Sequence, residues 1–175
     1  MEVKTIGVSD KDSMEMLQLV TFRLGNEEYS LDILRVQEII RYMDLTRVPR
    51  APEFVEGVIN LRGKVIPVLD LRNRFGLPDA GKNEDTRIIV VDIDDKTIGL
   101  KVDAVSEVLR LSSDTVEPPP SLVMDGSSEY IRGVGKVDQR LIILLDVSKL
   151  LSSTERHALS GAAKQAETSL QAVAV

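Results

Sequence analysis

The chain carries one sequence pattern twice. The stretch from Tyr29 to Arg41, YSLDILRVQEIIR, returns 69 residues later (98 − 29 = 69) as IGLKVDAVSEVLR, from Ile98 to Arg110. Further along, Gly57 recurs as Gly133, now 76 residues later (133 − 57 = 76), because the second copy carries an insertion near residues 121–129. A duplication of this kind predicts two similar subdomains related by a pseudo-twofold axis, with a seam and two like ends available to binding partners.

Alternation of apolar and polar side chains predicts the first two strands, and β-rich runs and the repeat predict the others. Val20, Phe22 and Leu24 lie two residues apart, and Gly25-Asn26 then supplies a two-residue hairpin turn. The first copy is expected to form strands over residues 18–24, 29–33, 36–41, 57–61 and 64–70, followed by a short helix over residues 71–75. The second copy is expected to form strands over residues 86–92, 96–102, 106–111, 133–137 and 139–146, with a helix that begins near Val147 and continues past Leu151.

These elements predict an all-β fold of two pseudo-symmetric five-stranded barrels, with short helices and a C-terminal helix. Closure into barrels is favoured because an open five-stranded sheet would expose two edges. We expect the first barrel over about residues 18–80 and the second over about residues 86–150, docked through apolar surface as one domain spanning residues 16–155. Residues 1–15 are expected to form a mobile N-terminal tail, and residues 156–175 a C-terminal tail.

Composition narrows the classes of function. The net charge of −6 and the aromatic content of 3% argue against nucleic-acid binding, which needs clustered Lys and Arg and aromatic stacking platforms. A small nucleic-acid-binding barrel nevertheless stays as the alternative function, because barrels of this size often bind RNA or DNA. No run reaches the ~18 apolar residues of a membrane span, and the N-terminus lacks the pattern of a signal peptide. A cytoplasmic location is therefore expected.

The sequence holds no recognisable catalytic, cofactor-binding or metal-binding constellation. There is no cysteine, and the one histidine, His157, lies near the C-terminal tail where no second ligand can complete a site. The acidic run that begins at Asp92 fails as a calcium loop, because Thr97 stands where glycine is needed. GVGK from Gly133 resembles a phosphate-binding loop but lacks the Ser or Thr that should follow the lysine. The sequence therefore predicts a protein that is not an enzyme and needs no cofactor.

Arg62 is the residue that most suggests a binding role. It belongs to the turn NLRG, which recurs in the second copy as VDQR, ending at Arg140. Hairpin geometry alone therefore does not require the arginine, and its planar guanidinium suits a carboxylate on a partner.

Two apolar pairs occupy equivalent places in the two copies: Val36 with Ile39, and Val105 with Val108. Either they belong to the core, or they form ridges near the seam that accept a partner helix. Glu38 and Glu107 lie in the middle of these stretches, facing either solvent or a basic side chain of a partner.

The run from Phe54 to Arg72, FVEGVINLRGKVIPVLDLR, resembles the signature of the CheW family of bacterial chemotaxis coupling proteins, and so does YSLDILRVQEI from Tyr29 to Ile39. The resemblance covers about residues 18–151. It implies two SH3-like barrels around a shared apolar centre. It also implies a non-catalytic scaffold of a two-component system, located in the cytoplasm at receptor arrays under the inner membrane.

The same resemblance implies two protein partners, and neither nucleic acid nor direct membrane insertion. The cytoplasmic hairpin tip of a methyl-accepting chemoreceptor would bind in a groove, with its carboxylate near Arg62. The regulatory domain of the histidine kinase CheA would dock on the apolar barrel ends, with Glu38 as the expected contact. The residues implied at the receptor groove are Val20, Ile33, Val36, Ile39, Arg62 and Val105. The glycines implied to be structural are Gly57, Gly63, Gly99 and Gly133.

Overall fold

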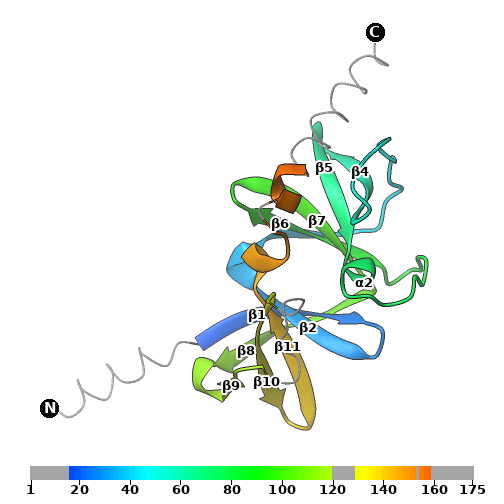
Figure 1. The fold of residues 1–175 in the computed structure, drawn as a ribbon. Coiled ribbons are helices and arrows are strands. Elements are labelled where there is room, and N and C mark those ends of the chain that lie inside the picture. Colours follow the sequence, from blue (N-terminus) through cyan, green and yellow to red (C-terminus); the bar gives the residue numbers. More distant parts are fainter. Residues whose placement is uncertain (1–15, 120–128, 153, 159–175) are drawn as a thin grey trace, which may run out of the picture.

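The computed structural model describes residues 16–119, 129–152 and 154–158, and these residues form two β-sheets in two lobes (Figure 1). One sheet has six strands: β1 (Met16–Leu24), β2 (Glu27–Asp32), β8 (Ala104–Ser112), β9 (Val116–Glu117), β10 (Ile131–Val137) and β11 (Arg140–Leu145). The other has five: β3 (Val36–Arg41), β4 (Val55–Leu61), β5 (Lys64–Asp70), β6 (Arg87–Ile93) and β7 (Lys96–Val102). We name the six-stranded sheet the terminal barrel and the five-stranded sheet the central barrel. The all-β fold of two small barrels is confirmed, but the terminal barrel has a sixth strand, β9, in addition to the five that were predicted.

Each barrel contains strands from both sequence copies. The terminal barrel has the order β8-β1-β2-β11-β10-β9, and the central barrel has the order β3-β6-β7-β5-β4. The β1–β2 hairpin of the first copy therefore lies among strands of the second copy, and the β6–β7 hairpin of the second copy lies among strands of the first. The prediction of one barrel over residues 18–80 and another over residues 86–150 is wrong, because the two copies exchange their first hairpins.

The register of the strand pairs shows that the two barrels are equivalent. β5 pairs with β7 in parallel, with Val68 opposite Gly99, and β11 pairs with β2 in parallel, with Leu144 opposite Ser30. The second pair follows from the first by the two sequence offsets, since 144 − 68 = 76 and 99 − 30 = 69. Bulges recur at matching places as well, in β3 against β6 and in β8 against β1. The predicted pseudo-twofold relation therefore extends to single residues.

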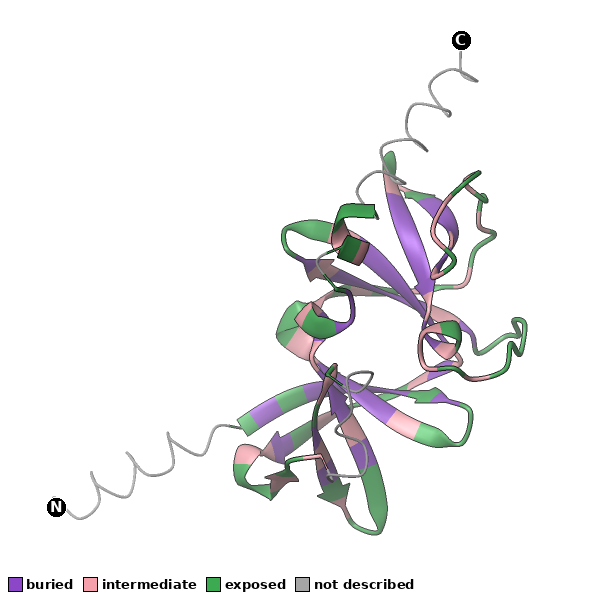
Figure 2. Cartoon of the chain, in the orientation of Figure 1, coloured by how far each residue is buried: buried purple, intermediate pink, exposed green. Residues whose placement is uncertain are grey.

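Three apolar clusters hold the domain together. One fills the central barrel, one fills the terminal barrel, and the largest lies between them, with strands of both sheets contributing (Figure 2). Within the large cluster Phe22 stacks near Tyr29, whose ring centroid lies 5.3 Å from that of Phe75, and Phe75 stacks on Tyr130. Burial raises the pKa of Tyr29 to about 12. The expected shared apolar centre is thus present.

A polar clamp also joins the two barrels. Arg72, in the short helix α2 (Leu71–Arg74), donates two hydrogen bonds to the carboxylate of Asp103, at N–O distances of 2.8 and 2.6 Å. The same carboxylate accepts a hydrogen bond from the backbone N–H of Gly25, in the β1–β2 turn of the terminal barrel. The pKa of Asp103 is lowered by the hydrogen bonds from Arg72.

The helices are shorter than the sequence predicts at the C-terminal end. Instead of a continuous helix from Val147 past Leu151, a 3-10 turn spans Val147–Lys149, and residues 154–158 form a separate helical turn. The carboxylate of Asp146 caps the 3-10 turn at the backbone N–H of Ser148. The domain also extends beyond residue 155, because Arg156 donates to Asp94 and to the carbonyl of Ser148. The remaining residues of both predicted tails lie outside the described part.

The exchange of hairpins predicts that the two sequence copies fold only together. A chain divided between Ala80 and Gly81, two exposed loop residues, yields fragments that each lack the partner strands of their own hairpin. We expect an equimolar mixture to regain the far-ultraviolet circular dichroism of the intact protein and to elute as a 1:1 complex. A cooperatively unfolding monomer from either fragment alone would contradict this arrangement.

Candidate functional site

Arg62 is held at the tip of the central barrel by an unusual hairpin turn. The β4–β5 turn places Arg62 at φ +55° and Gly63 at φ +83°, the left-handed conformations of a type I′ hairpin. The side chain of Asn60 stabilises the turn by accepting a hydrogen bond from the N–H of Gly63, at 2.9 Å. The side chain of Arg62 stays 72% exposed, so its guanidinium is accessible from solvent.

Arg62 forms a two-pronged ion pair with Glu38 of β3. Its two terminal nitrogens lie 2.5 and 2.8 Å from the two carboxylate oxygens, the fork-to-fork arrangement that arginine favours with carboxylates. β3 and β4 are the two edges of the five-stranded sheet. The ion pair therefore connects the outer strands and helps to close the central barrel.

The ion pair shifts the acidity of both groups. The hydrogen bond from Arg62 lowers the pKa of Glu38, and the attraction of the guanidinium charge adds to this effect. The hydrogen bond to Glu38 raises the pKa of Arg62 in turn. Both groups are therefore charged at neutral pH, and salt screens their attraction because the site is open to solvent.

The terminal barrel has an equivalent ion pair built from a different arginine. Glu107 takes the place of Glu38, and it pairs with Arg140 of β11 at 3.2 Å. Arg140 also lies 3.3 Å from Glu28, which replaces the contact between Lys64 and Thr97 in the central barrel. Each barrel thus has an arginine–glutamate pair beside its last hairpin turn, with the arginine at different positions in the two barrels.

The residues expected at a receptor groove do not form one exposed surface. Val20 is only 2% exposed, which leaves almost no area for a partner. Val36 and Val105 pack against the shared core, whereas Ile39 is 39% exposed. In each apolar pair the first residue thus packs on the core and the second, Ile39 or Val108, is exposed, and a role for these pairs as ridges for a partner helix stays a prediction. Ile33 lies half-buried in a 3-10 turn (Ile33–Arg35) beside Leu34, a leucine that is 88% exposed and that the sequence analysis did not select.

The structure joins two residues for which the family resemblance implies different partners. Glu38, expected to face the kinase, is bonded to Arg62, expected to face the receptor. A signal for this pairing was present in the duplication. Glu38 recurs as Glu107, and each copy has an arginine in its last hairpin, Arg62 or Arg140.

The four glycines occupy places where a side chain would be disfavoured, by crowding at three of them and by backbone conformation at the fourth. A Cβ on Gly57 would lie 2.8 Å from the carbonyl oxygen of Thr46, closer than van der Waals contact allows. Gly133, its equivalent, meets the carbonyl of Glu117 at the same distance, and Gly99 faces the side chain of Ile88, also at 2.8 Å. Gly63 has open space around it but a positive φ. Crowding thus accounts for three of these glycines, and backbone conformation for the fourth.

Within residues 16–119, 129–152 and 154–158, no cluster of three or more His, Asp or Glu side chains is arranged to hold a metal ion. The helices in this part of the chain are all too short or too polar to cross a membrane.

The chain thus forms a small domain of two SH3-like barrels. The two copies of the sequence pattern exchange hairpins between these barrels, and each barrel has an arginine–glutamate ion pair beside its last hairpin turn. Residues 18–155 match the CheW-like domain family. The chain is 41% identical to the chemotaxis protein CheW of Klebsiella aerogenes, over 84% of this chain and 89% of the relative. It is 33% identical to protein FrzA of Myxococcus xanthus, over 79% of this chain and 88% of the relative.

A solved structure shows the same likeness in three dimensions. The crystal structure of the scaffolding protein TtCheW from Thermoanaerobacter tengcongensis has a TM-score of 0.73 and 41% sequence identity, covering 81% of this chain and 96% of that chain. The chain therefore belongs to the CheW family.

The ion pair predicts a pH-dependent contribution to stability. Because folding lowers the pKa of Glu38, the stabilisation is complete above the unfolded pKa, about 4.3, and is lost as pH falls through the folded value. Carbon-13 NMR titration should show the pKa of Glu38 rising in Arg62→Gln but not in Lys96→Gln, a change at an exposed lysine. An unchanged titration of Glu38 in Arg62→Gln would contradict the pairing.

Crowding predicts the effect of adding a methyl group at Gly57. The Gly57→Ala variant must move the backbone at Thr46, so its free energy of unfolding should fall by about 1–3 kcal/mol, typical of overpacking. Gly133→Ala should behave alike, and exposed Ser106→Ala should stay within about 0.5 kcal/mol of wild type. Urea denaturation measures all three. A Gly57→Ala variant as stable as Ser106→Ala would show that the loop over Gly57 yields without cost.

Proposed function

We propose that this chain is a non-catalytic adaptor that couples chemoreceptors to the histidine kinase CheA in chemotaxis signalling. In this proposal it is located in the cytoplasm and contributes to receptor arrays under the inner membrane. Family membership supports the proposal, since the relatives carry the names of chemotaxis and scaffolding proteins. Those relatives give no support to nucleic-acid binding, the alternative raised by the small barrels. A net charge of −6 also opposes contact with a polyphosphate.

The observation that carries the proposal is the ion pair of Arg62 and Glu38 on the edge strand β3, which also exposes an apolar side chain, Ile39, on its opposite face. Ile39 follows Glu38 in β3, and the exposed Leu34 precedes the strand. An amphipathic helix docks by placing apolar side chains in such a surface and a charged side chain on its rim. We therefore place the chemoreceptor tip at Arg62, Ile39, Leu34 and Ile33, with Val20, Val36 and Val105 supporting the surface from within the fold.

Glu38 competes with a receptor carboxylate for the guanidinium of Arg62. Both terminal nitrogens of the guanidinium donate to Glu38, so a receptor carboxylate that binds in the same two-pronged manner has to displace it. Displacement would leave Glu38 charged and exposed on β3, ready to meet a basic side chain of the kinase. In this proposal the two contacts assigned from the sequence are linked through one ion pair.

A charge swap separates the contact with a partner from the ion pair within the chain. Arg62→Glu alone should abolish receptor control of CheA autophosphorylation in mixtures with receptor-bearing membranes, because it places like charges together and removes the receptor contact. Arg62→Glu combined with Glu38→Arg should regain the unfolding free energy of the wild type, because the pair re-forms with reversed polarity. It should not regain receptor control.

Lys96→Glu is the matched control, since it makes the same change of net charge at an exposed lysine that begins β7 and should leave coupling unchanged. If the double variant coupled receptor and kinase normally, Arg62 would serve only the internal pair. If the wild-type chain bound neither receptor membranes nor CheA, the adaptor function itself would be refuted.

A further inference from the structure

Two arginines of the central barrel adopt a backbone conformation that arginine rarely takes. In the described residues, a positive φ occurs at five positions other than glycine, and three of them are aspartates, which tolerate it: Asp94, Asp95 and Asp138. The other two are Arg62 and Arg50, with φ of +55° and +65°. Arg62 belongs to the ion pair described above. Arg50 has no role in that pair.

Arg50 lies in a tight turn that would suit glycine or asparagine better. The backbone N–H of Ala51 donates to the carbonyl of Val48 at 3.2 Å, closing a four-residue turn with Pro49 second and Arg50 third. A turn with proline second and positive φ third is of type II, and its third position favours glycine or asparagine. The backbone therefore gains nothing from an arginine here, and strain of this kind points to a role for the side chain.

The surrounding loop is fixed in place on the barrel. Thr46 and Val58 of β4 exchange both backbone hydrogen bonds, at 2.9 and 2.8 Å, in an isolated bridge. Gly57 has no side chain at the point where Thr46 passes over it. After the turn, the N–H of Val55 donates to the carbonyl of Pro52. The loop thus presents its exposed side chains from a backbone anchored at both ends.

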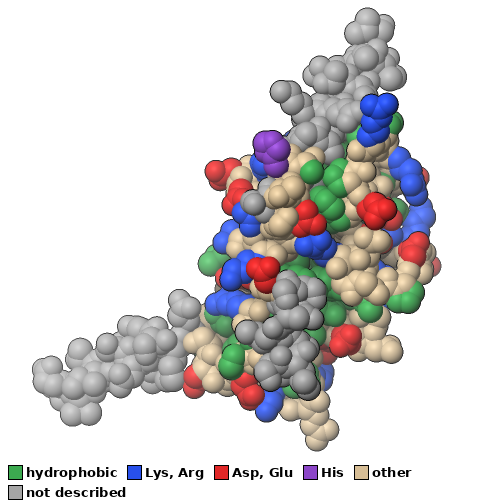
Figure 3. All heavy atoms as spheres, in the orientation of Figure 1, with side chains coloured by type: hydrophobic (Ala, Val, Ile, Leu, Met, Phe, Trp, Pro, Cys, Tyr) green, Lys and Arg blue, Asp and Glu red, His purple; other side chains and the backbone are tan. Residues whose placement is uncertain are grey.

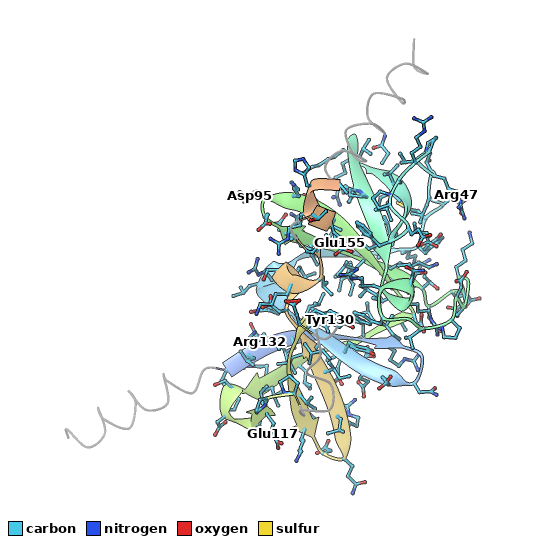
Figure 4. The ribbon with its side chains drawn as sticks, in the orientation of Figure 1. Arg47, Asp95, Glu117, Tyr130, Arg132 and Glu155 are labelled. Carbon is cyan, nitrogen blue, oxygen red and sulfur yellow. The ribbon has the colours of Figure 1, made fainter. Side chains whose placement is uncertain are left out.

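Arg47 and Arg50 are both exposed on this loop. In the part of the chain that the structure describes, neither guanidinium makes an ion pair or a hydrogen bond. Figure 4 shows Arg47 extending outward from the loop, and Figure 3 shows Lys and Arg side chains gathered along this rim of the molecule. The two arginines, with Asn73 and apolar atoms of Val48 and Pro52, line a hollow of about 470 Å³.

We propose that this hollow, the Arg47–Arg50 site, binds an acidic segment of a protein partner. Two exposed arginines on an anchored loop can each offer a planar pair of N–H donors to a carboxylate, while proline and valine accept an apolar neighbour of the acidic residue. Little side-chain pairing has to be broken first, unlike at Arg62. Binding here is independent of the receptor and kinase contacts proposed above.

The charges around the hollow favour a short acidic peptide over a nucleic acid. Glu53 and Glu56 also line it, and Glu56 is already paired with Lys101 at 3.0 Å. A continuous polyphosphate would meet these carboxylates, whereas a segment with isolated Asp or Glu side chains can reach the arginines and avoid them. Removing the charge of Glu53 should therefore strengthen binding of an acidic peptide.

The test is a titration of the nitrogen-15-labelled full chain with a short synthetic peptide that alternates glutamate with leucine. We expect amide shifts confined to residues 46–56 and 73, weakening with added salt because exposed charges are screened over ~10 Å at 0.1 M. The same peptide with glutamine in place of glutamate should produce no shifts. Shifts spread over the whole chain, or equal shifts with the glutamine peptide, would overturn the proposal, as would tighter binding of a single-stranded oligonucleotide.

Arg50→Gly separates the role of the side chain from its effect on the fold. Glycine accepts the positive φ without strain, so the melting temperature should equal or exceed that of the wild type. Peptide affinity should nevertheless fall at least about tenfold, about 1.4 kcal/mol. The matched control for lost charge is Arg110→Gln, at an exposed residue of β8, because Arg110→Gly would disturb that strand. The control should bind the peptide normally. Wild-type affinity in Arg50→Gly would refute the site.

Discussion

The parallel pairings of β2 with β11 and of β7 with β5 are the constraint on which the rest of the structure depends. Each pairing joins a hairpin of one sequence copy to strands of the other, so neither copy can complete its sheet alone. Two neighbouring parallel strands need a long connection between them. In both pairings here, that connection contains strands of the second copy. The exchange also brings both hairpins to the seam, where Phe22 and Tyr29 of one meet Ile98 and Leu100 of the other in the shared core. The exchange of hairpins between the duplicated copies therefore also forms the common core.

With the sheets completed in this way, the free edges become the place where the two barrels differ. Each barrel has an ion pair between a glutamate on a bulged edge strand, β3 or β8, and an arginine from its last hairpin. The central barrel uses Arg62, at the turn itself, and leaves it largely exposed. The terminal barrel uses Arg140, two residues further along, and shares it between Glu107 and Glu28. Only the central pair thus has an arginine committed to a single carboxylate that a partner can replace.

The sequence predicted the strands closely because their signals are local, and it failed where contacts cross between the copies. Alternation located β1 and β2, a β-rich run located β5, and the Arg62-Gly63 turn was expected from its residues. The assignment of whole barrels to residues 18–80 and 86–150 failed because a hairpin has the same pattern whichever copy it joins. Val20 was assigned to the receptor groove through the family resemblance, whereas its alternation with Phe22 and Leu24 agrees with the burial that the structure shows. The bond between Arg62 and Glu38 links opposite sheet edges, and such contacts depend on how the sheet closes.

Departures from the pseudo-twofold relation show which residues the fold itself does not require. Asp138 stands where Arg62 does in the other barrel (138 − 62 = 76), with the same φ of +55°. An aspartate therefore satisfies this turn, and stability of the hairpin does not explain the arginine. Arg50 likewise lies in a turn that glycine would form without strain, so stability of the turn does not explain this arginine. Both arginines lie on the central barrel, on segments flanking β4. Among the residues that the structure describes, arginines with a positive φ thus lie on one barrel only, which is how a nearly symmetric scaffold can offer its partners two unequal faces.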